Sequence, residues 1–482
     1  MASVKKNYFY NLLYQVFLLI IPLLVTPYLA RTIGEEGAGR YAFSASVATY
    51  FTLFASLGFG YYAQRLVASH KEDPALQARD FWEVVFARAV AVAISLAVYL
   101  ILLFSGAYAQ KYRRTLFALG INVLAVGTDI TFYFQGNELF GKIVLRNISA
   151  RLLGFIGVFL LVKDAGDVWI YAALQSVSLL LGGLSLWFSL PKDVLTFPKR
   201  GLKPWKHVLP TLVLFLPTVA TSVYTALDKT LIGVITGSDK ELGNYEYAER
   251  LVKMALTVLT SLGAVMIPRN AERFACGDKS GVKRNIFKSV RFALLLGVPL
   301  CLGLAAVAGN LTPWYLGAGY KKAAALIALL SPIVPVIGLS NVFGLQYMIP
   351  AGKDKQFTVA IVCGALVNLL LNLLLIKPMK SYGAAVATVC AEGVVTAVMY
   401  GMIGKELDLK EAFKGSWRYF VAGGATYLPS RILSGALEAS FFNSLLIAGV
   451  GATIYFLCLA AIGDPFFKES VGFIKNRFKR RG

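Results

Sequence analysis

The stretch "YNLLYQVFLLIIPLLVTPYLARTIGEEGAG", from Tyr10 to Gly39, decides the fold class of this chain. It carries no charge before Arg31, and about 20 apolar residues are enough for an α-helix to cross the hydrocarbon core of a bilayer. Pro22 and Pro27 lie inside this apolar run, although proline removes a backbone donor and bends a helix. The stretch predicts a membrane-spanning helix with two weak points, followed by a glycine-rich turn.

Apolar runs of this length recur along the whole chain. Of its 482 residues, 57% are hydrophobic and 15% are charged, whereas about a quarter of the residues of a soluble protein are charged. The sequence therefore predicts an all-α integral membrane protein of about fourteen transmembrane helices. The expected spans are residues 9–30, 41–62, 81–105, 115–135, 144–162, 168–190, 208–234, 245–268, 291–312, 323–349, 357–377, 383–401, 418–436 and 441–462.

The first of these segments resembles a secretory signal peptide in one respect, because Lys5 and Lys6 precede it. It is too long for the apolar core of a signal peptide, and no clear small-x-small cleavage site follows it. We expect it to be retained as a helix.

The net charge of +22 has an uneven distribution over the connecting segments. Alternate connections, together with both ends of the chain, hold 31 of the 48 Lys and Arg residues, and the other connections hold 12. Basic residues accumulate on the cytoplasmic side of membrane proteins. The pattern predicts a multi-pass protein of the cell membrane with both termini in the cytoplasm, and it explains the basic segments without nucleic-acid binding.

The residues of common catalytic and metal sites are scarce. Four of the five cysteines lie in apolar spans, and both histidines, His70 and His207, lie in predicted cytoplasmic loops. No phosphate-binding glycine loop followed by Lys-Ser or Lys-Thr occurs. We therefore predict no catalytic residue, no metal site and no enzyme activity, with transport driven by an ion gradient, the membrane potential or the substrate gradient.

Two patterns recur in the two halves of the chain. Gly39-x-Tyr41-x-Phe43 matches Gly243-x-Tyr245-x-Tyr247, and Gly136-Asn137-Glu138 matches Gly352-Lys353-Asp354. The offsets predict a duplication of six helices, and since six is even the two copies enter the membrane from the same side. We expect two parallel six-helix lobes around a central cavity, at residues 1–200 and 201–402, with two peripheral helices and a basic tail at 403–482.

The seventh span also contains two prolines, Pro210 and Pro217. A single proline in a membrane helix commonly does no more than shape its packing. Because the helix that opens each half carries two, we predict that Pro22, Pro27, Pro210 and Pro217 allow these helices to bend during gating.

Charged residues inside membrane spans are costly and point to function. A cavity lined by cations would receive an anionic headgroup such as a pyrophosphate, because arginine binds phosphate oxygens with two parallel hydrogen bonds. The candidates for this lining are Arg31, Arg88, Arg151, Lys229, Arg250 and Lys253. Asp129, Asp228, Glu249 and Glu392 are candidates for ion coupling or for ion pairs such as Asp228 with Lys229 and Glu249 with Lys253.

Several of these stretches together resemble the polysaccharide flippases, the Wzx-type branch of the multidrug/oligosaccharidyl-lipid/polysaccharide superfamily. The opening segment and "DITFYFQGNELFGKIVLRN" carry the resemblance, together with "LDKTLIG", "GNYEYAERLV" and "PAGKDKQFTVAIVCGALVNLLLNLLLI". Asp129, Gln135, Gly136, Glu138 and Arg146 match the family's fourth-span signature. Phe132 and Asn137 depart from it, because tryptophan and leucine are usual there.

This resemblance, over about residues 5–400, implies a flippase for undecaprenyl-pyrophosphate-linked oligosaccharide with a V-shaped cavity that alternates between the two faces. It implies membrane lipids and the polysaccharide polymerase machinery as partners, no cofactor, and Na⁺ or H⁺ as a coupling ion. A multidrug or cation antiporter of the same superfamily is an alternative, although the charges within the spans are slightly more basic than acidic. A polytopic glycosyltransferase or polymerase is a second alternative, which the short connections disfavour.

Overall fold

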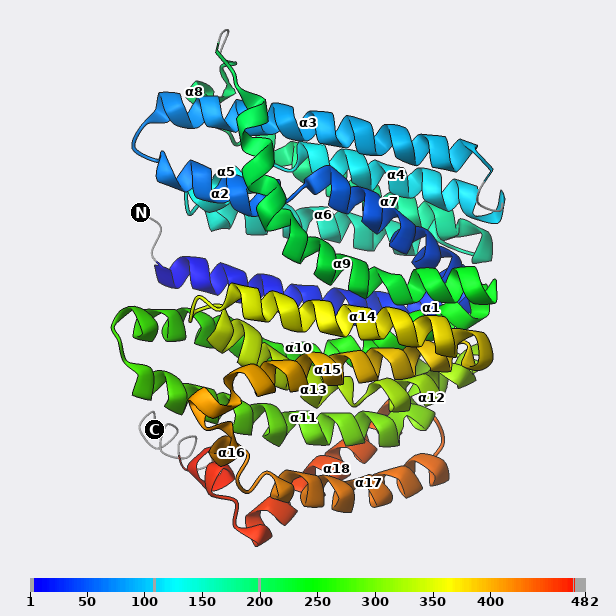
Figure 1. Ribbon diagram of the computed structural model, residues 1–482. Coiled ribbons are helices and arrows are strands. Elements are labelled where there is room, and N and C mark those ends of the chain that lie inside the picture. The colour runs from blue at the N-terminus through cyan, green and yellow to red at the C-terminus, as the bar shows by residue number, and fades with distance from the viewer. Residues whose placement is uncertain (1–3, 107–109, 198–200, 471, 473–482) are drawn as a thin grey trace. The chain divides into compact units, whose positions relative to one another are not determined.

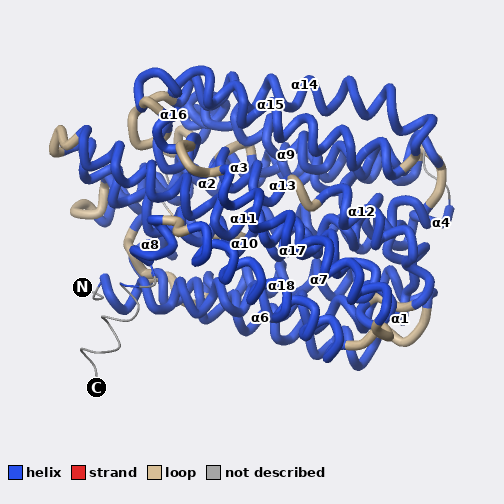
Figure 2. The backbone as a smooth tube through the Cα atoms, turned by 90° about the horizontal axis from the view of Figure 1, so that it is seen from below, coloured by secondary structure: helices blue, strands red, loops and turns tan. Residues whose placement is uncertain are grey.

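The computed structural model describes residues 4–106, 110–197, 201–470 and 472. These residues form helices and turns, and no strand occurs among them (Figure 2). A helix satisfies its own backbone donors and acceptors, which is the requirement that the hydrocarbon core of a bilayer imposes. The chain divides into two compact units, Met1–Gly243 and Asn244–Gly482.

Nine α-helices and two short 3₁₀ turns build the described part of the first unit (Figure 1). They are α1 (Val4–Ser56), α2 (Phe59–Ser69), α3 (Pro74–Phe104), α4 (Gln110–Thr128), α5 (Thr131–Gly136), α6 (Phe140–Leu161), η1 (Ala165–Asp167), α7 (Val168–Trp187), α8 (Lys192–Leu195), η2 (Pro204–His207) and α9 (Val208–Thr236). Helix α4 packs on α7 and α1, and α9 packs on α1 and α2.

The first helix contains the first predicted span and most of the second. Its one break in helical backbone geometry is Gly34, with φ 67° and ψ −179°. A side chain makes this φ costly, so glycine is the residue that permits the chain to turn here. The two segments of α1 run in different directions on either side of this turn (Figure 1). The break therefore lies at the predicted glycine-rich turn and not at Pro22 or Pro27, where the helical geometry continues.

The second unit begins within α10 and ends with two helices that pack on each other and on α11. Its core joins α11, α13, α15 and α17 around Phe343, Tyr347, Met399 and Tyr419. Its elements are α10 (Asp239–Ala275), α11 (Lys279–Tyr315), η3 (Ala318–Tyr320), α12 (Lys321–Leu330), α13 (Ile333–Phe343), the π-helical turn η4 (Gly344–Met348), α14 (Asp354–Met379), α15 (Ser381–Leu407), α16 (Leu409–Ala412), α17 (Trp417–Ala436) and α18 (Phe441–Ile462).

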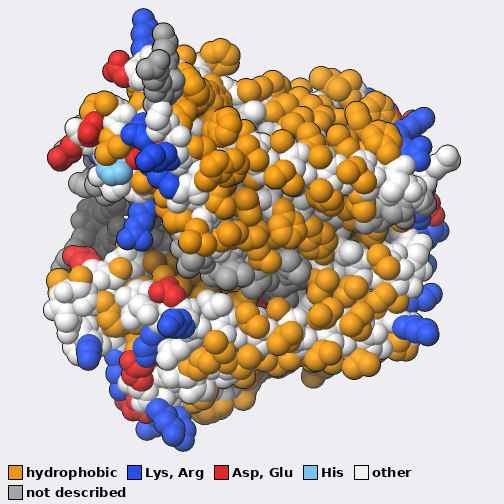
Figure 3. Space-filling view, turned by 45° about the horizontal axis from the view of Figure 1, so that its top comes forward, with side chains coloured by type: hydrophobic (Ala, Val, Ile, Leu, Met, Phe, Trp, Pro, Cys, Tyr) orange, Lys and Arg blue, Asp and Glu red, His pale blue; other side chains and the backbone are white. Residues whose placement is uncertain are grey.

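Ten helical segments among the described residues are long and apolar enough to cross a membrane, or eleven if the bent pair α12–α13 counts as one span. Each of the fourteen predicted spans overlaps a helix, but α1 joins two of them, and α17 is not among the ten segments. The multi-pass helical fold is confirmed, and the number fourteen stays a prediction. On the face that Figure 3 shows, hydrophobic side chains cover the middle of the helices and charged ones gather near their ends.

The boundary between the two compact units lies after Gly243. The reason is that α9 packs on α1 and α2 within the first unit. The division into lobes at residues 200 and 402 stays a prediction.

Candidate functional site

The family-like stretch "DITFYFQGNELFGKIVLRN" forms a joint between three helices. Helix α4 ends at Thr128, α5 occupies Thr131–Gly136, and α6 begins at Phe140. The Asp129 carboxylate accepts hydrogen bonds from the backbone and hydroxyl of Thr131, at the start of α5. The guanidinium of Arg146, on α6, lies 3.2 Å from the same carboxylate oxygen. One acidic side chain therefore fixes two helices at a break in the backbone.

The same break leaves carbonyl groups at the end of α4 that need donors, because no helical turn follows to supply them. The Arg88 guanidinium, on α3, donates to the carbonyl of Asp129 at 2.6 Å, and the Trp187 indole donates to that of Thr128 at 2.8 Å. Arg88 is 8% exposed. A cation at the carboxyl end of a helix also interacts favourably with the helix dipole. Arg88 therefore has a structural role, because it supplies a donor to the helix joint.

Two further residues of the stretch have backbone roles. A Cβ atom on Gly136 would lie 2.8 Å from the carbonyl oxygen of Gln64, so glycine permits the close approach of α5 to α2. Glu138 has a φ of 61°, in the turn that leads into α6. Gln135 is partly buried in α5, and its carbonyl accepts the backbone N–H of Glu138. The motif therefore acts here through backbone geometry and one ion pair.

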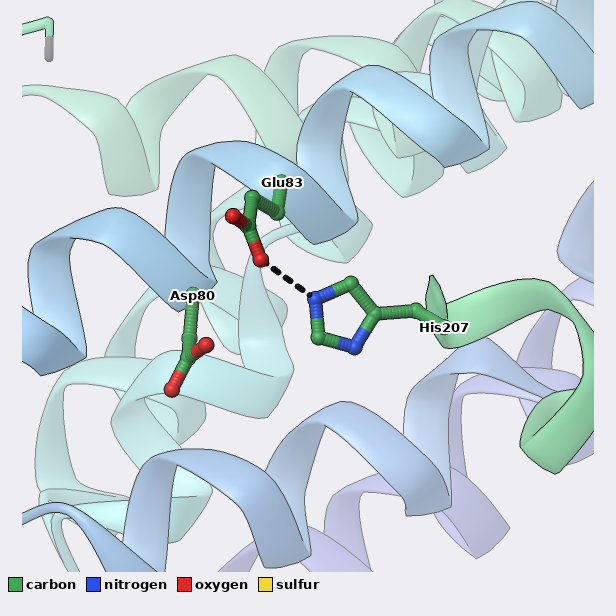
Figure 4. A group of neighbouring side chains, drawn as sticks. All are labelled: Asp80, Glu83 and His207. Atoms are coloured by element: carbon green, nitrogen blue, oxygen red, sulfur yellow. Dashed lines mark hydrogen bonds and ion pairs between the residues drawn. The ribbon is translucent and has the colours of Figure 1, made fainter. Parts of the chain in front are cut away.

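A second group of charged residues joins the start of α3 to the linker that precedes α9. Glu83 is fully buried and accepts four hydrogen bonds. Its Oε1 receives the Arg79 side chain at 3.1 Å and the Lys203 backbone N–H at 2.9 Å. Its Oε2 lies 2.6 Å from the Lys206 Nζ. The same oxygen lies 2.9 Å from the His207 Nε2 (Figure 4). We call this the linker cluster.

The protonation of His207 follows from its two neighbours. A carboxylate can only accept, so Nε2 carries the hydrogen that faces Glu83, and Nδ1 accepts from the Tyr62 hydroxyl at 2.7 Å. Burial lowers the pKa of His207, and the Lys206 charge lowers it further against the opposing effect of Glu83. Burial acts to lower the pKa of Lys206 as well, but the hydrogen bond to Glu83 raises it overall. The ring is therefore neutral and the lysine charged near pH 7.

Asp80, Glu83 and His207 could in principle hold a metal ion, because each offers a ligand atom within 4.8 Å of the others. The Lys206 ammonium, however, lies 2.6 Å from Glu83 and 3.4 Å from Asp80. The ammonium therefore takes the position between the carboxylates that a metal ion would need. We interpret the cluster as a network of ion pairs that holds the linker to α3.

A third group forms where α10 crosses the second segment of α1. A Cβ atom on Gly39 would lie 1.9 Å from the Asp239 carbonyl oxygen, and one on Gly243 would lie 1.9 Å from that of Glu35. Residue 239 follows residue 35 by 204 positions, and residue 243 follows residue 39 by the same number. This is the offset of the repeated glycine pattern. The contact is reciprocal, because each glycine lies against the backbone carbonyl of the residue four positions before the other glycine.

Asp239 stabilises this helix crossing through ion pairs and a hydrogen bond. Its carboxylate, in a residue that is 8% exposed, lies 3.3 Å from Arg40 and 2.9 Å from Lys111. It also accepts the Tyr112 hydroxyl at 2.6 Å. Lys240 lies 3.6 Å from Glu35 in return. We call the glycine contact and these ion pairs the α1–α10 clasp.

The remaining cation candidates lie in several places. Arg31 on α1 and Arg151 on α6 are exposed, and Lys229 on α9 is partly buried. In α10, Arg250 lies 2.7 Å from Glu246 and Lys253 lies 2.6 Å from Glu249, each four residues apart. The Glu249–Lys253 pair confirms the ion pair expected from the spacing.

The remaining candidates, two acidic residues and two prolines, lie at separate places in the described residues. Asp228 on α9 is 4% exposed, and Glu392 on α15 is partly buried. Pro210 lies in the first turn of α9, where a missing N–H breaks no helical hydrogen bond, so it does not break this helix. The side chain of Pro217 lies outside the described residues.

A family model described as polysaccharide biosynthesis protein matches residues 4–274, more than half of the chain. The chain belongs to the polysaccharide biosynthesis protein family. A second family model, lipid II flippase MurJ, matches residues 206–451. Among curated relatives, the "Putative O-antigen transporter" of Escherichia coli strain K12 is 27% identical over 408 residues, which cover 82% of this chain and 96% of the relative.

Solved structures share the fold at low sequence identity. The inward closed conformation of lipid II flippase MurJ matches with a TM-score of 0.66 and 14% identity, covering 94% of this chain and all of that one. An inward-facing multidrug resistance MATE transporter of the MOP superfamily matches with a TM-score of 0.58 and 13% identity, covering 83% of this chain and 99% of that one. This member of the polysaccharide biosynthesis protein family therefore shares its fold with the two solved transporters.

Proposed function

We propose that this protein is a flippase that moves undecaprenyl-pyrophosphate-linked oligosaccharide across the cytoplasmic membrane for surface polysaccharide assembly. The observation that carries the proposal is the similarity to an O-antigen transporter over 96% of that relative's length. The multi-pass helical fold and the family membership agree with it. The protein acts without catalytic chemistry, by alternating access, with both termini in the cytoplasm and with Na⁺ or H⁺ as a coupling ion.

The α1–α10 clasp supports the alternating-access part of the proposal. Its cations belong to the connections with few basic residues, which the charge distribution assigns to the outer side. Side chains of Arg40 and Lys111 are 34% and 37% exposed, so each ion pair contributes only about 1 kcal/mol or less. In the proposed transport cycle, a clasp made of weak pairs around a close helix contact can open at low cost.

The cationic lining of the cavity stays a proposal at Arg31, Arg151, Lys229, Arg250 and Lys253. Arg151 is the sharpest test, because its side chain is exposed on a membrane helix, where a charge without a function is costly. Arg88, by contrast, acts through the carbonyl of Asp129.

We expect Arg151→Ala to reduce polysaccharide export about tenfold at a normal level of protein in the membrane, because one charged hydrogen bond to a phosphate contributes about 1.5 kcal/mol or more. We expect Arg88→Ala to reduce both export and protein level, because the helix joint loses a buried donor. Export is measured in a strain that depends on this protein, with Lys355→Ala, an exposed cation, as the matched control. Full export by Arg151→Ala would show that Arg151 does not serve the transported headgroup. A normal protein level for Arg88→Ala would show that its hydrogen bond to the Asp129 carbonyl is not needed for the helix joint.

The alternative function is an ion-coupled multidrug or cation antiporter. The MATE neighbour supports this alternative through its fold alone. Deletion of the gene should then increase drug sensitivity and leave surface polysaccharide intact, whereas the flippase proposal predicts loss of polysaccharide and unchanged drug sensitivity.

A further inference from the structure

A small basic hollow lies in the second unit, where α17 begins and α18 ends. Its volume is about 60 Å³, several times the ~10–15 Å³ that one water molecule requires. The charged side chains on its wall are Arg291 from α11, Lys414 and Arg418 around the start of α17, and Asp464 after α18. It is separate from the joint, the linker cluster and the clasp, which all lie in the first unit.

Ser416 gives this hollow an unpaired polar group. The residue is 6% exposed, lines the hollow and precedes α17, a helix of 20 residues. Its hydroxyl oxygen is buried and has no hydrogen-bond partner. A hydroxyl of this kind usually finds a partner, because leaving it unpaired costs about 1–3 kcal/mol. The Arg418 and Tyr419 N–H groups at the start of α17 already donate to the carbonyls of Gly415 and Ser416. The positive end of the helix dipole still favours a negative charge beside the hydroxyl.

The charges of the hollow favour an anion. The Arg418 guanidinium lies 3.6 Å from the Asp464 carboxylate, so that acidic group faces one of the three cations. Asp464 also accepts the backbone N–H of Phe467 at 2.8 Å. The Nε of Arg418 is nevertheless buried without a partner. Three cations against one carboxylate leave two positive charges and two unused donors, one on Ser416 and one on Arg418, at the same place.

We propose that this hollow binds a phosphate group, held by the Ser416 hydroxyl and the Arg418 guanidinium, with Arg291 and Lys414 supplying further charge. Guanidinium and hydroxyl donors suit phosphate oxygens, which accept several hydrogen bonds at once. Basic pockets between membrane helices on the cytoplasmic side commonly bind the headgroups of anionic lipids. The phosphate comes either from such a lipid, with its acyl chains along the apolar surface, or from free phosphate in solution. The phosphate group bound here does not belong to the transported substrate.

The test compares two sources of phosphate on the purified full-length protein. Thermal unfolding and bound-lipid mass measurement are carried out in micelles with phosphatidylglycerol, with phosphatidylcholine, or with inorganic phosphate against chloride at equal ionic strength. The variants are Ser416→Ala, which removes one hydroxyl, and the double variant Arg291→Gln/Lys414→Gln. The matched control is Lys405→Gln/Lys410→Gln, which changes two exposed lysines of the same unit that are not among the residues lining the hollow.

We expect phosphatidylglycerol to bind and to raise the unfolding temperature, and phosphatidylcholine to do neither. Both test variants should weaken the affinity for phosphatidylglycerol about tenfold, since one charged hydrogen bond contributes about 1.5 kcal/mol, and the control should not. An equal effect of inorganic phosphate, lost in the same variants, would support the site and identify free phosphate as its ligand. If neither anion binds, or if the test variants bind as well as the control, the proposed site does not exist.

Discussion

The Gly39→Val variant will reach the membrane at a normal level and export about a hundredfold less polysaccharide than the wild type. A Cβ atom at this position would lie 1.9 Å from the Asp239 carbonyl oxygen, so α1 and α10 must separate to accommodate it. Overpacking of this kind costs about 1–3 kcal/mol, and about 2.8 kcal/mol shifts an equilibrium a hundredfold. The state closed by the α1–α10 clasp would then be too rarely populated to complete the transport cycle.

The control for this variant is Gly60→Val in α2, where a Cβ atom would meet no heavy atom within 4 Å. The reciprocal variant Gly243→Val should show the same loss as Gly39→Val, because its Cβ would lie 1.9 Å from the Glu35 carbonyl oxygen. Export is quantified together with the amount of protein in isolated membranes. Normal export by both clasp variants would show that the helix crossing is not needed for transport.

Replacing Glu83 will have the largest effect on stability. We expect Glu83→Ala to lower the free energy of unfolding by about 2–4 kcal/mol, because the buried His207 ring N–H and the Lys203 backbone N–H both lose their acceptor, and an unsatisfied buried donor costs about 1–3 kcal/mol. Lys206 and His207 would lose their common acceptor, and the Lys203 backbone N–H would lose its partner. The linker before α9 would detach from α3. The measurement is thermal unfolding of the purified protein, monitored by helical circular dichroism.

The matched control is Glu72→Ala, at an exposed position just before α3, which should change the unfolding temperature little. The milder Glu83→Gln keeps two polar atoms and should lose less stability than Glu83→Ala. Equal unfolding temperatures for Glu83→Ala and the wild type would refute the view that the linker cluster holds the linker in place.

The sequence was sufficient for the features that repeat or that have a strong periodic signal. Apolar length predicts the membrane helices, and the helical fold is confirmed. The repeated glycines Gly39 and Gly243 were recognised as equivalent, and they meet at one helix crossing. The Asp129 and Arg146 positions of the family-like stretch proved to be paired across the helix joint.

The buried charges of the linker cluster could not be found in the same way. Helix α3 was expected from residue 81, but it begins at Pro74, with the Asp73 carboxylate accepting the backbone N–H groups of Ala75 and Leu76. An N-cap aspartate followed by proline is a local start signal, and using it would have placed Asp80 and Glu83 on one helix. The pairing of Glu83 with His207, more than 120 residues later, depends on tertiary packing that no local pattern contains.

A charged residue in a membrane span can serve either the structure or the function, and the sequence alone does not distinguish the two roles. Arg88 and Arg151 look alike as arginines in apolar segments, yet Arg88 donates to a helix-end carbonyl and Arg151 is exposed. The prolines illustrate the same point, because the turn within α1 occurs at Gly34, where a positive φ is needed.

The most direct test of the central claim is a flipping assay with the purified protein in liposomes. A fluorescently labelled undecaprenyl-pyrophosphate oligosaccharide is placed in one leaflet, and its arrival in the other leaflet is followed by protection from a membrane-impermeant quencher. The flippase account predicts transfer well above that of protein-free liposomes, transfer at the wild-type rate in Gly60→Val, and little transfer in Gly39→Val. Transfer no faster than in protein-free liposomes, with uptake of cationic drugs by the same vesicles, would contradict the account and favour the antiporter.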